Sequence, residues 1–347
     1  MSPTTGPTSG STAITITSSR FEQNDITYCK FGLGGTEIKA TWLSHTAISC
    51  VTEVTTATSD SDFDATIGAK SIFLSVNAGN DYIDSGHTFS RYKDMVATTN
   101  NNSANTNKNH YGPSSGGTPV TISGRNFQDV EFFKCRFTSN NIDYVVTPSH
   151  ISIASDDGDE SDDALNTVDT LDTVVCNSPT TSTASSIYQT TATISISLNN
   201  KDFTLTPHIF NYFLPPVVSN VYPATGPIHG NSMVSVYGEN FAKHTNTEIF
   251  CKFGDNEVAA SFVSSNLITC VSPPSTDLLS RAVALSVSTN SGINYSQDAS
   301  SFKYSNPIVV NSIFPLSGPE TGSTSVSVFG EGEWSEVEWS GVQPGKY

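Results

Sequence analysis

The chain has 347 residues, of which 36% are hydrophobic, so it exceeds one typical domain and can form roughly two to four small cores. Only 14% of the residues are charged and the formal net charge is −17, so a phosphate backbone would be repelled and nucleic acid is not an expected partner. No run of 18 apolar residues occurs, and the N-terminus lacks the basic start and apolar core of a signal peptide.

The first segment, residues 1–94, begins with a turn and continues in short strands. The turn has the pattern Gly-Pro-x-x-Gly, and the alternation that follows it, with β-branched residues at every second position, predicts a half-buried strand. A Phe, a Cys-basic-Phe triplet, a second cysteine, a strand ending in an Asn turn and an aromatic pair come next. In order, these features are Gly6 to Gly10, Ala13 to Thr17, Phe21, Cys29-Lys30-Phe31, Cys50, Phe73 to Asn77, and Phe89 with Tyr92.

Residues 95–109 are rich in Asn and Thr and have no apolar periodicity, which predicts a linker. The same series of features then recurs in residues 110–213, with a longer interval between the two cysteines. This interval contains the acidic run 156–163, which we interpret as an insertion in a surface loop. The recurring features are Gly112 to Gly116, Pro119 to Ser123, Phe127, Cys135-Arg136-Phe137, Cys176, Ile194 to Asn199, and Phe210 with Tyr212.

The third segment, residues 214–305, is the most complete copy, and residues 306–347 repeat only its beginning. Glu333 stands where this fourth copy should have its Phe, and residues 334–347 match no part of the pattern. Because half a sandwich cannot bury its strands, we expect this tail to be poorly ordered. The first segment in turn lacks an equivalent of Val217 to Val221, the opening strand of the third. Both ends therefore look cut.

Short strands between Gly, Pro, Asn and Ser turns predict an all-β fold of tandem immunoglobulin-like β-sandwiches. The third segment contains Gly-Glu-Asn-Phe at 238–241, Cys-Lys-Phe-Gly at 251–254 and Ile-Thr-Cys-Val-Ser-Pro-Pro at 268–274. This order of motifs resembles the IPT/TIG domain, an E-set-type module of plexins, the hepatocyte growth factor receptor and Rel-type transcription factors. The resemblance covers nearly all of residues 1–332 and implies a plexin-type role in recognition.

The six cysteines form one pair in each complete copy, with 20, 40 and 18 residues between the partners. Pairs at equivalent places in every copy favour three intradomain disulfides over the alternative, buried free thiols in a cytosolic protein. Disulfides persist outside the cytosol, which favours an extracellular or cell-surface location. The predicted pairs are Cys29 with Cys50, Cys135 with Cys176, and Cys251 with Cys270.

Two sequons for N-glycosylation, at Asn101 and Asn294, are compatible with secretion, although two sequons are near chance in an Asn-rich chain.

Three patterns that suggest chemistry are better explained as structure. Gly112 to Gly116 matches the nucleophile-elbow string Gly-x-Ser-x-Gly, but an alternating strand follows it where that motif requires a helix. The acidic run 60–64 starts like a calcium loop, yet Ala65 and Ser71 stand where an EF-hand requires Gly and Glu. For the run 156–163, solvated charge is favoured over weak calcium binding. We therefore expect no catalytic, cofactor or metal site.

These observations predict a non-catalytic recognition or adhesion segment with an unidentified protein or glycan partner and no membrane contact of its own. A structural spacer, or an accessory module of a larger surface protein or polysaccharide-degrading enzyme, is the alternative. DNA binding, as in Rel-type factors, is disfavoured by the net charge of −17 and the lack of a basic recognition loop. Because both ends look cut, we expect a piece of a longer surface protein, from which the signal peptide and membrane anchor are absent.

Overall fold

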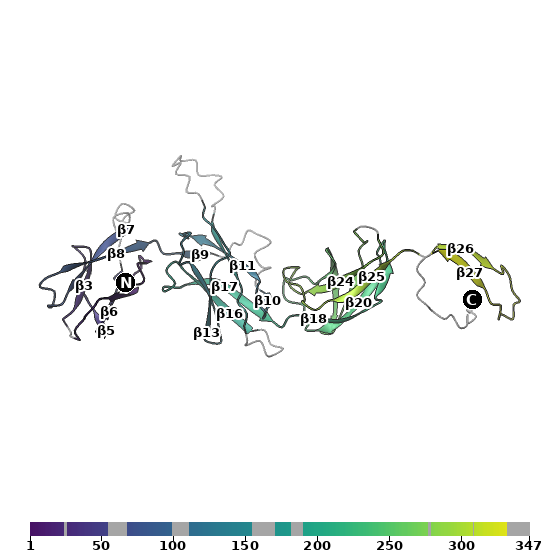
Figure 1. The fold of residues 1–347 in the computed structure, drawn as a ribbon, viewed down its shortest axis with the longest axis horizontal. Coiled ribbons are helices and arrows are strands. Elements are labelled where there is room, and N and C mark those ends of the chain that lie inside the picture. Colours follow the sequence, from purple (N-terminus) through teal and green to yellow (C-terminus); the bar gives the residue numbers. More distant parts are fainter. Residues whose placement is uncertain are drawn as a thin grey trace, which may run out of the picture. The chain divides into compact units, whose positions relative to one another are not determined.

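The computed structural model describes residues 1–23, 26–54, 68–98, 111–154, 171–181, 190–276, 279–307 and 309–331 (Figure 1). Every regular element in these ranges is a strand, which confirms the all-β fold. None of the described residues belongs to a helix long and apolar enough to cross a membrane. The chain divides into two compact units, Met1–Phe213 and Leu214–Tyr347, which are described separately. The first contains repeats 1 and 2, and the second contains repeat 3 and the start of repeat 4.

Repeat 1 is a sandwich of a five-stranded sheet, in the order β1-β8-β7-β3-β4, and a three-stranded sheet, in the order β2-β6-β5. The first strand pairs with the last in parallel, and the other pairs are antiparallel. Alternate residues of β2, Ile14 and Ile16, are buried between the sheets, as the period of two predicts. The strands are β1 (Thr5–Pro7), β2 (Ala13–Thr17), β3 (Tyr28–Phe31), β4 (Ile38–Lys39), β5 (Thr41–Ser44), β6 (Ala47–Val51), β7 (Gly68–Ser75) and β8 (Ile83–Tyr92).

Repeat 2 has the same design, with sheets in the orders β10-β17-β16-β12-β13 and β14-β15-β11-β9. Its core contains Phe137 and Phe210, whose rings meet edge to face with centroids 5.8 Å apart. The strands are β9 (Val96–Thr98), β10 (Tyr111–Pro113), β11 (Pro119–Arg125), β12 (Lys134–Ser139), β13 (Ile142–Val146), β14 (His150–Ser152), β15 (Asp172–Asn177), β16 (Thr190–Ser197) and β17 (Thr204–Phe213).

Repeat 3 joins its two sheets into one of eight strands, in the order β18-β20-β23-β22-β21-β24-β25-β19. The long β22 makes this possible, because its first half pairs with β21 and its second half with β23. The strands are β18 (Val217–Tyr222), β19 (Thr225–Pro227), β20 (Met233–Glu239), β21 (Phe250–Phe253), β22 (Asn256–Ser264), β23 (Leu267–Val271), β24 (Ala282–Ser288) and β25 (Ser300–Ser305).

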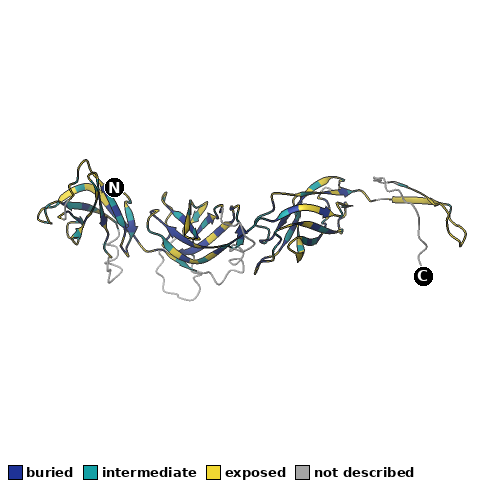
Figure 2. Cartoon of the chain, turned by 90° about the horizontal axis from the view of Figure 1, so that it is seen from below, coloured by how far each residue is buried: buried dark blue, intermediate teal, exposed yellow. Residues whose placement is uncertain are grey.

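Repeat 4 is represented by β26 (Val309–Phe314) and β27 (Ser327–Glu331), which pair like β18 and β20 of repeat 3. Val221 and Val236 are buried in repeat 3, whereas their equivalents Ile313 and Val328 are 44% and 48% exposed. Figure 2 shows the repeat 4 hairpin largely in the colour of exposed residues. In the part of repeat 4 that the structure describes, no further strand covers the inner face of this hairpin. The tail that we expected to be poorly ordered, residues 334–347, lies outside the described residues.

The Gly-Pro-x-x-Gly turn has the same structural basis in all three complete repeats. The first glycine lies against an aromatic ring, and a Cβ atom there would come within 2.5–2.8 Å of the Cζ atom of that Phe. The second glycine has a φ angle of 75–77°, which other residues rarely adopt. The glycine pairs are Gly6 and Gly10, Gly112 and Gly116, and Gly226 and Gly230. In repeat 2 the turn leads into β11, so the nucleophile-elbow interpretation is excluded by the fold as well.

The basic residue of each Cys-basic-Phe triplet lies over an aromatic ring. The triplet strands are β3, β12 and β21, and the rings belong to the turns that follow their neighbours in the sheet, β7, β16 and β24. Lys30 Nζ is 4.0 Å from the ring centroid of Tyr82, and Arg136 Cζ is 4.1 Å from that of Phe203. Lys252 Nζ is 5.2 Å from the centroid of Tyr295. A cation over an aromatic face is a favourable contact, so the triplet supplies a buried cysteine and phenylalanine on one face and a cation on the other.

A disulfide bond joins the two halves of the core in each complete repeat. The bonds link Cys29 to Cys50, Cys135 to Cys176 and Cys251 to Cys270, with Cα atoms 6.4–6.6 Å apart. These are the pairs expected from the sequence, and the described residues contain no free cysteine. All six side chains are buried, so the bonds lie in the hydrophobic cores.

Part of the expected linker is a strand. Residues 95–109 were expected to be a linker, but Val96–Thr98 form β9, which pairs with β11 as the opening strand of repeat 2. Val96 lies opposite Arg125, as Val217 lies opposite Glu239 in repeat 3. The rest of the expected linker, residues 99–109, lies outside the described residues.

In repeat 1, which we expected to lack its opening strand, Ser2 forms a β-bridge with Thr15. Tyr222 pairs with Ser235 at the corresponding place in repeat 3. This bridge stands where the end of the opening strand lies in repeat 3.

Candidate functional site

 Repeats 1 and 2 are joined by only three residues. These residues, Lys93, Asp94 and Met95, lie between the end of β8 at Tyr92 and the start of β9 at Val96. Tyr92 is 6% exposed and Met95 is 4% exposed, and both belong to the hydrophobic core of repeat 2. The last residue of repeat 1 therefore helps to form the core of its neighbour, and within their unit the two repeats share apolar packing at the junction.

The position of Tyr92 differs from the one that the sequence suggested. It was paired with Phe89 as the closing aromatic pair, in analogy with Tyr212 and Tyr304. In the strand register, Tyr92 lies opposite Pro7, the place that Phe213 occupies in repeat 2, and Arg91 takes the place of Tyr212. Because successive residues of a strand point to opposite faces, this shift of one residue directs Tyr92 away from the core of repeat 1.

The turn between β16 and β17 connects repeat 2 to repeat 1 by hydrogen bonds. Asn199 Oδ1 accepts hydrogen bonds from the backbone N–H groups of Lys201 (3.0 Å) and Asp202 (2.9 Å). Asn199 Nδ2 donates to the backbone oxygen of Thr5 (2.7 Å) and to Asp202 Oδ2 (2.8 Å). The same Asp202 oxygen accepts a hydrogen bond of 2.6 Å from Thr12 Oγ1. The turn is thus both internally fixed and attached to the neighbouring repeat.

In the equivalent turns of the other repeats, the asparagine side chain donates a hydrogen bond within its own turn. In repeat 3, Asn290 Nδ2 donates to Asn294 Oδ1 at 2.9 Å, and in repeat 1, Asn77 Nδ2 donates to Asp81 Oδ2 at 3.0 Å. All three turns share the Ser-x-Asn sequence in which the serine hydroxyl donates to the asparagine. One recurring turn therefore serves as an internal brace in repeats 1 and 3 and as an inter-repeat contact in repeat 2.

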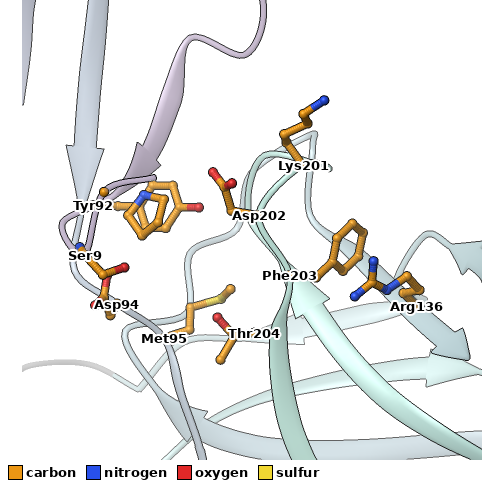
Figure 3. A pocket seen from close by; sticks show the side chains of 11 residues that line it. Ser9, Tyr92, Asp94, Met95, Arg136, Lys201, Asp202, Phe203 and Thr204 are labelled. Carbon is orange, nitrogen blue, oxygen red and sulfur yellow. The ribbon is translucent and has the colours of Figure 1, made fainter. Parts of the chain in front are cut away.

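A pocket of about 410 Å³ lies at this junction (Figure 3). Repeat 1 and the connection contribute Tyr92, Asp94 and Met95, and the turn of repeat 2 contributes Asp202. Figure 3 shows the Tyr92 hydroxyl and the Asp202 carboxylate on the same side of the pocket. The complete lining is Pro7, Ser9, Gly10, Tyr92, Asp94, Met95, Arg136, Lys201, Asp202, Phe203 and Thr204.

The charged groups around the pocket include two acids and two bases. Asp94 Oδ1 accepts hydrogen bonds from the Ser9 backbone N–H (3.1 Å) and from Thr8 Oγ1 (3.3 Å). Arg136 donates from Nε to Ser195 Oγ at 3.1 Å, in addition to its contact with Phe203, whereas Lys201 is exposed. The formal charges of the lining therefore cancel.

Tyr92 has the least satisfied polar group of this site. Its hydroxyl is buried and has no hydrogen-bond partner among the described residues. Burial, and to a smaller extent the nearby Asp202 and Asp94 carboxylates, raise the pKa of Tyr92, so the hydroxyl keeps its proton. The site can donate one hydrogen bond from this group and accept others at its carboxylates, which suits binding.

The other residues singled out in the sequence do not meet at this pocket. Asn101 and the acidic runs 60–64 and 156–163 lie outside the described residues. Asn294 belongs to the turn of repeat 3, and Ser296 of its sequon is 7% exposed and donates to the backbone oxygen of Asp298 at 2.7 Å. In the folded protein, the sequon hydroxyl is thus engaged internally. The described residues contain no group of three or more His, Cys, Asp or Glu side chains that could hold a metal ion.

Sequence reasoning missed Tyr92, Asp94, Lys201 and Asp202 as members of one site. Tyr92 and Asp94 were assigned to the end of repeat 1. Lys201 and Asp202 belong to a turn of repeat 2, about 110 residues later in the sequence. The recurring Ser-x-Asn turn was the available signal. It gives no indication of which copy contacts a neighbouring repeat.

The chain is similar to known proteins over most of its length. A family model for the IPT/TIG domain matches residues 1–90, 106–212 and 216–304. Plexin-2 of Caenorhabditis briggsae is 30% identical over 119 residues, which cover 34% of this chain and 6% of that protein.

Two solved structures are also similar. The full extracellular region of plexin A4 has 14% sequence identity and a TM-score of 0.30, and the match covers 95% of this chain and 30% of that chain. The FN1–FN3 domains of chicken CNTN1 have 10% identity and a TM-score of 0.24, with 85% and 95% of the two chains covered. The chain thus spans a small part of the plexins that it matches.

Proposed function

Because the chain belongs to the IPT/TIG domain family, we propose that it is a non-catalytic recognition and adhesion segment of an extracellular or cell-surface protein. The observation that carries this proposal is the disulfide bond at the same place in each of the three complete repeats. Such bonds persist in oxidising compartments and are rare in the cytosol. The plexin relative supports the same location, although the chain corresponds to only 6% of its length.

The junction of repeats 1 and 2 supports a role in presenting a defined surface. Shared packing at Tyr92 and Met95, together with the hydrogen bonds of Asn199 and Asp202, fixes residues of both repeats around one pocket. A binding site assembled from two domains needs such preorganisation, because ordering flexible parts on binding reduces affinity. This junction is therefore the region at which we expect a partner to be recognised.

The proposal is tested with the complete 347-residue chain, secreted from a eukaryotic cell with an affinity tag. Binding to the surface of intact cells of the source organism should be saturable and should be competed by untagged chain. The matched control is the same preparation after reduction and alkylation, which removes the disulfides and with them the folded repeats. Absence of saturable, fold-dependent binding would favour the structural spacer instead.

Thiol titration of the unfolded, unreduced protein tests the compartment separately. We expect no reactive thiol, because all six cysteines are paired. Six titratable thiols in the protein isolated from its native source would contradict both the disulfides and the extracellular location.

A further inference from the structure

The Tyr92 hydroxyl is an unsatisfied donor at the junction of repeats 1 and 2. The side chain is 6% exposed, and its hydroxyl has no partner among the described residues although two carboxylates lie near it. Leaving a buried hydroxyl without a partner is costly, so such groups in native proteins usually require an explanation. A ligand in the adjoining pocket would supply the missing acceptor.

Several other groups at the pocket also have bonding capacity left. Both side-chain hydrogen bonds of Asp94 involve its Oδ1 atom, and those of Asp202 involve its Oδ2 atom. One oxygen of each carboxylate therefore remains available in the part of the chain that the structure describes. The Lys201 ammonium group adds up to three donors at the rim. The pocket thus offers acceptors and donors side by side.

The presence of both hydrogen-bond donors and carboxylate acceptors in the pocket restricts the class of ligand that it can bind. An apolar ligand would leave the Tyr92 hydroxyl and the carboxylates without water or partners, which is unfavourable. A calcium ion requires six to eight oxygen ligands, whereas the lining supplies two carboxylates and also carries Lys201 and Arg136. A free anion would meet the two carboxylates. A neutral ligand whose groups both donate and accept hydrogen bonds satisfies all of them.

We propose that the pocket between repeats 1 and 2 binds a sugar residue of a glycan, with the Tyr92 hydroxyl donating a hydrogen bond to it. Sugar hydroxyls donate to the available oxygens of Asp94 and Asp202 and accept from Tyr92 and Lys201. The volume of about 410 Å³ lies within the range of roughly 300–1,000 Å³ found for small-molecule sites. The inference deepens the proposed recognition function, on which it rests in taking the ligand from an extracellular surface.

The experiment uses the full chain and compares two tyrosine variants by saturation-transfer NMR and titration calorimetry. The probes are glucose, galactose, mannose, N-acetylglucosamine, cellobiose and chitobiose. Tyr92→Phe removes the hydroxyl and keeps the ring in the core. Tyr212→Phe is the matched control, because Tyr212 is also buried with an unpartnered hydroxyl but does not line the pocket. Melting curves establish that both variants are folded.

We expect at least one of these saccharides to bind the wild-type chain and Tyr212→Phe with equal affinity. Its affinity for Tyr92→Phe should be about five- to tenfold lower, as expected for the loss of one hydrogen bond. Absence of binding of every probe to the wild-type chain, or equal weakening by both variants, would overturn the proposal. So would Tyr92-dependent binding of lysine methyl ester without any saccharide, since the pocket would then accept a basic side chain.

The outcome is separable from the test of the proposed function. If cell-surface binding is saturable but unaffected by Tyr92→Phe and no saccharide binds, only the pocket assignment fails. If neither the cells nor the saccharides bind, both fail.

Discussion

The hydrogen bond between Thr12 of repeat 1 and Asp202 of repeat 2 provides a direct measure of how strongly the two repeats are coupled. Thr12 is fully buried, and its Oγ1 atom lies 2.6 Å from Asp202 Oδ2. Thr12→Val removes the hydroxyl at nearly constant volume, and Asp202→Asn removes the charge. The double-mutant cycle of these two substitutions isolates the energy of the pair from the effects of each change alone.

Hydrogen bonds to charged groups contribute about 1.5–3 kcal/mol. Asp202 is only partly buried, so we expect a coupling energy at or somewhat below the lower end of this range, about 1–2 kcal/mol. This corresponds to a change of about 5- to 30-fold in the unfolding equilibrium of repeat 1.

Urea denaturation followed by Trp42 fluorescence measures this equilibrium, because Trp42 lies in β5 of repeat 1. Trp334→Phe and Trp339→Phe in all proteins leave Trp42 as the only tryptophan, since the chain has three. A coupling energy below about 0.3 kcal/mol, the usual limit of additivity, would refute the reasoning. Ser232→Ala, the equivalent change in repeat 3, is the control and should show no coupling with Asp202→Asn.

Two further predictions concern the stability of single repeats. Replacing Cys135 and Cys176 by Ala should destabilise repeat 2 by about 3.9 kcal/mol, and replacing Cys251 and Cys270 should destabilise repeat 3 by about 3.2 kcal/mol, because the closed loops span 41 and 19 residues. Calorimetric melting of each variant checks the order, and an equal or reversed order would contradict the loop-closure argument. Burial lowers the pKa of His244 to about 4, so the unfolded chain takes up a proton first as the pH falls below about 6.5. Stability should therefore be fully present above that pH and decrease by about 1–2 kcal/mol between pH 7 and pH 5 in urea denaturation of repeat 3. The same measurement on His244→Gln should show this decrease largely abolished.

Much of the fold could be predicted because its signals are local and recur. Alternation in β2, β11 and β20 identifies half-buried strands, and the cysteine pairs stand at the same places in every copy. The opening strand of repeat 2 was missed for a physical reason. Only two residues separate β18 from β19 in repeat 3, whereas twelve separate β9 from β10 in repeat 2. Alignment of the repeats on their Gly-Pro turns therefore put the start of repeat 2 after its true opening strand.

The candidate site could not be predicted in the same way. Tyr92 has an aromatic side chain where an aromatic pair was expected, but a shift of one residue in a strand directs it to the opposite face. The partners of this tyrosine come from a turn of the next repeat, and their proximity depends on how the two repeats pack. Neither composition nor spacing contains that information.

The parallel pairing of the Gly-Pro strand with the last strand of each repeat has a mechanical consequence. β1 pairs with β8, β10 with β17, and β19 with β25. Tension on the two ends of such a pair acts along the strands in opposite directions, so its hydrogen bonds resist in shear and must break together. The disulfide then limits how far an opened repeat can lengthen. Reduction of Cys135–Cys176, which are 41 positions apart, would release the residues between them, or about 140 Å of additional extension. At a surface under load, the redox state would therefore set how far the segment stretches.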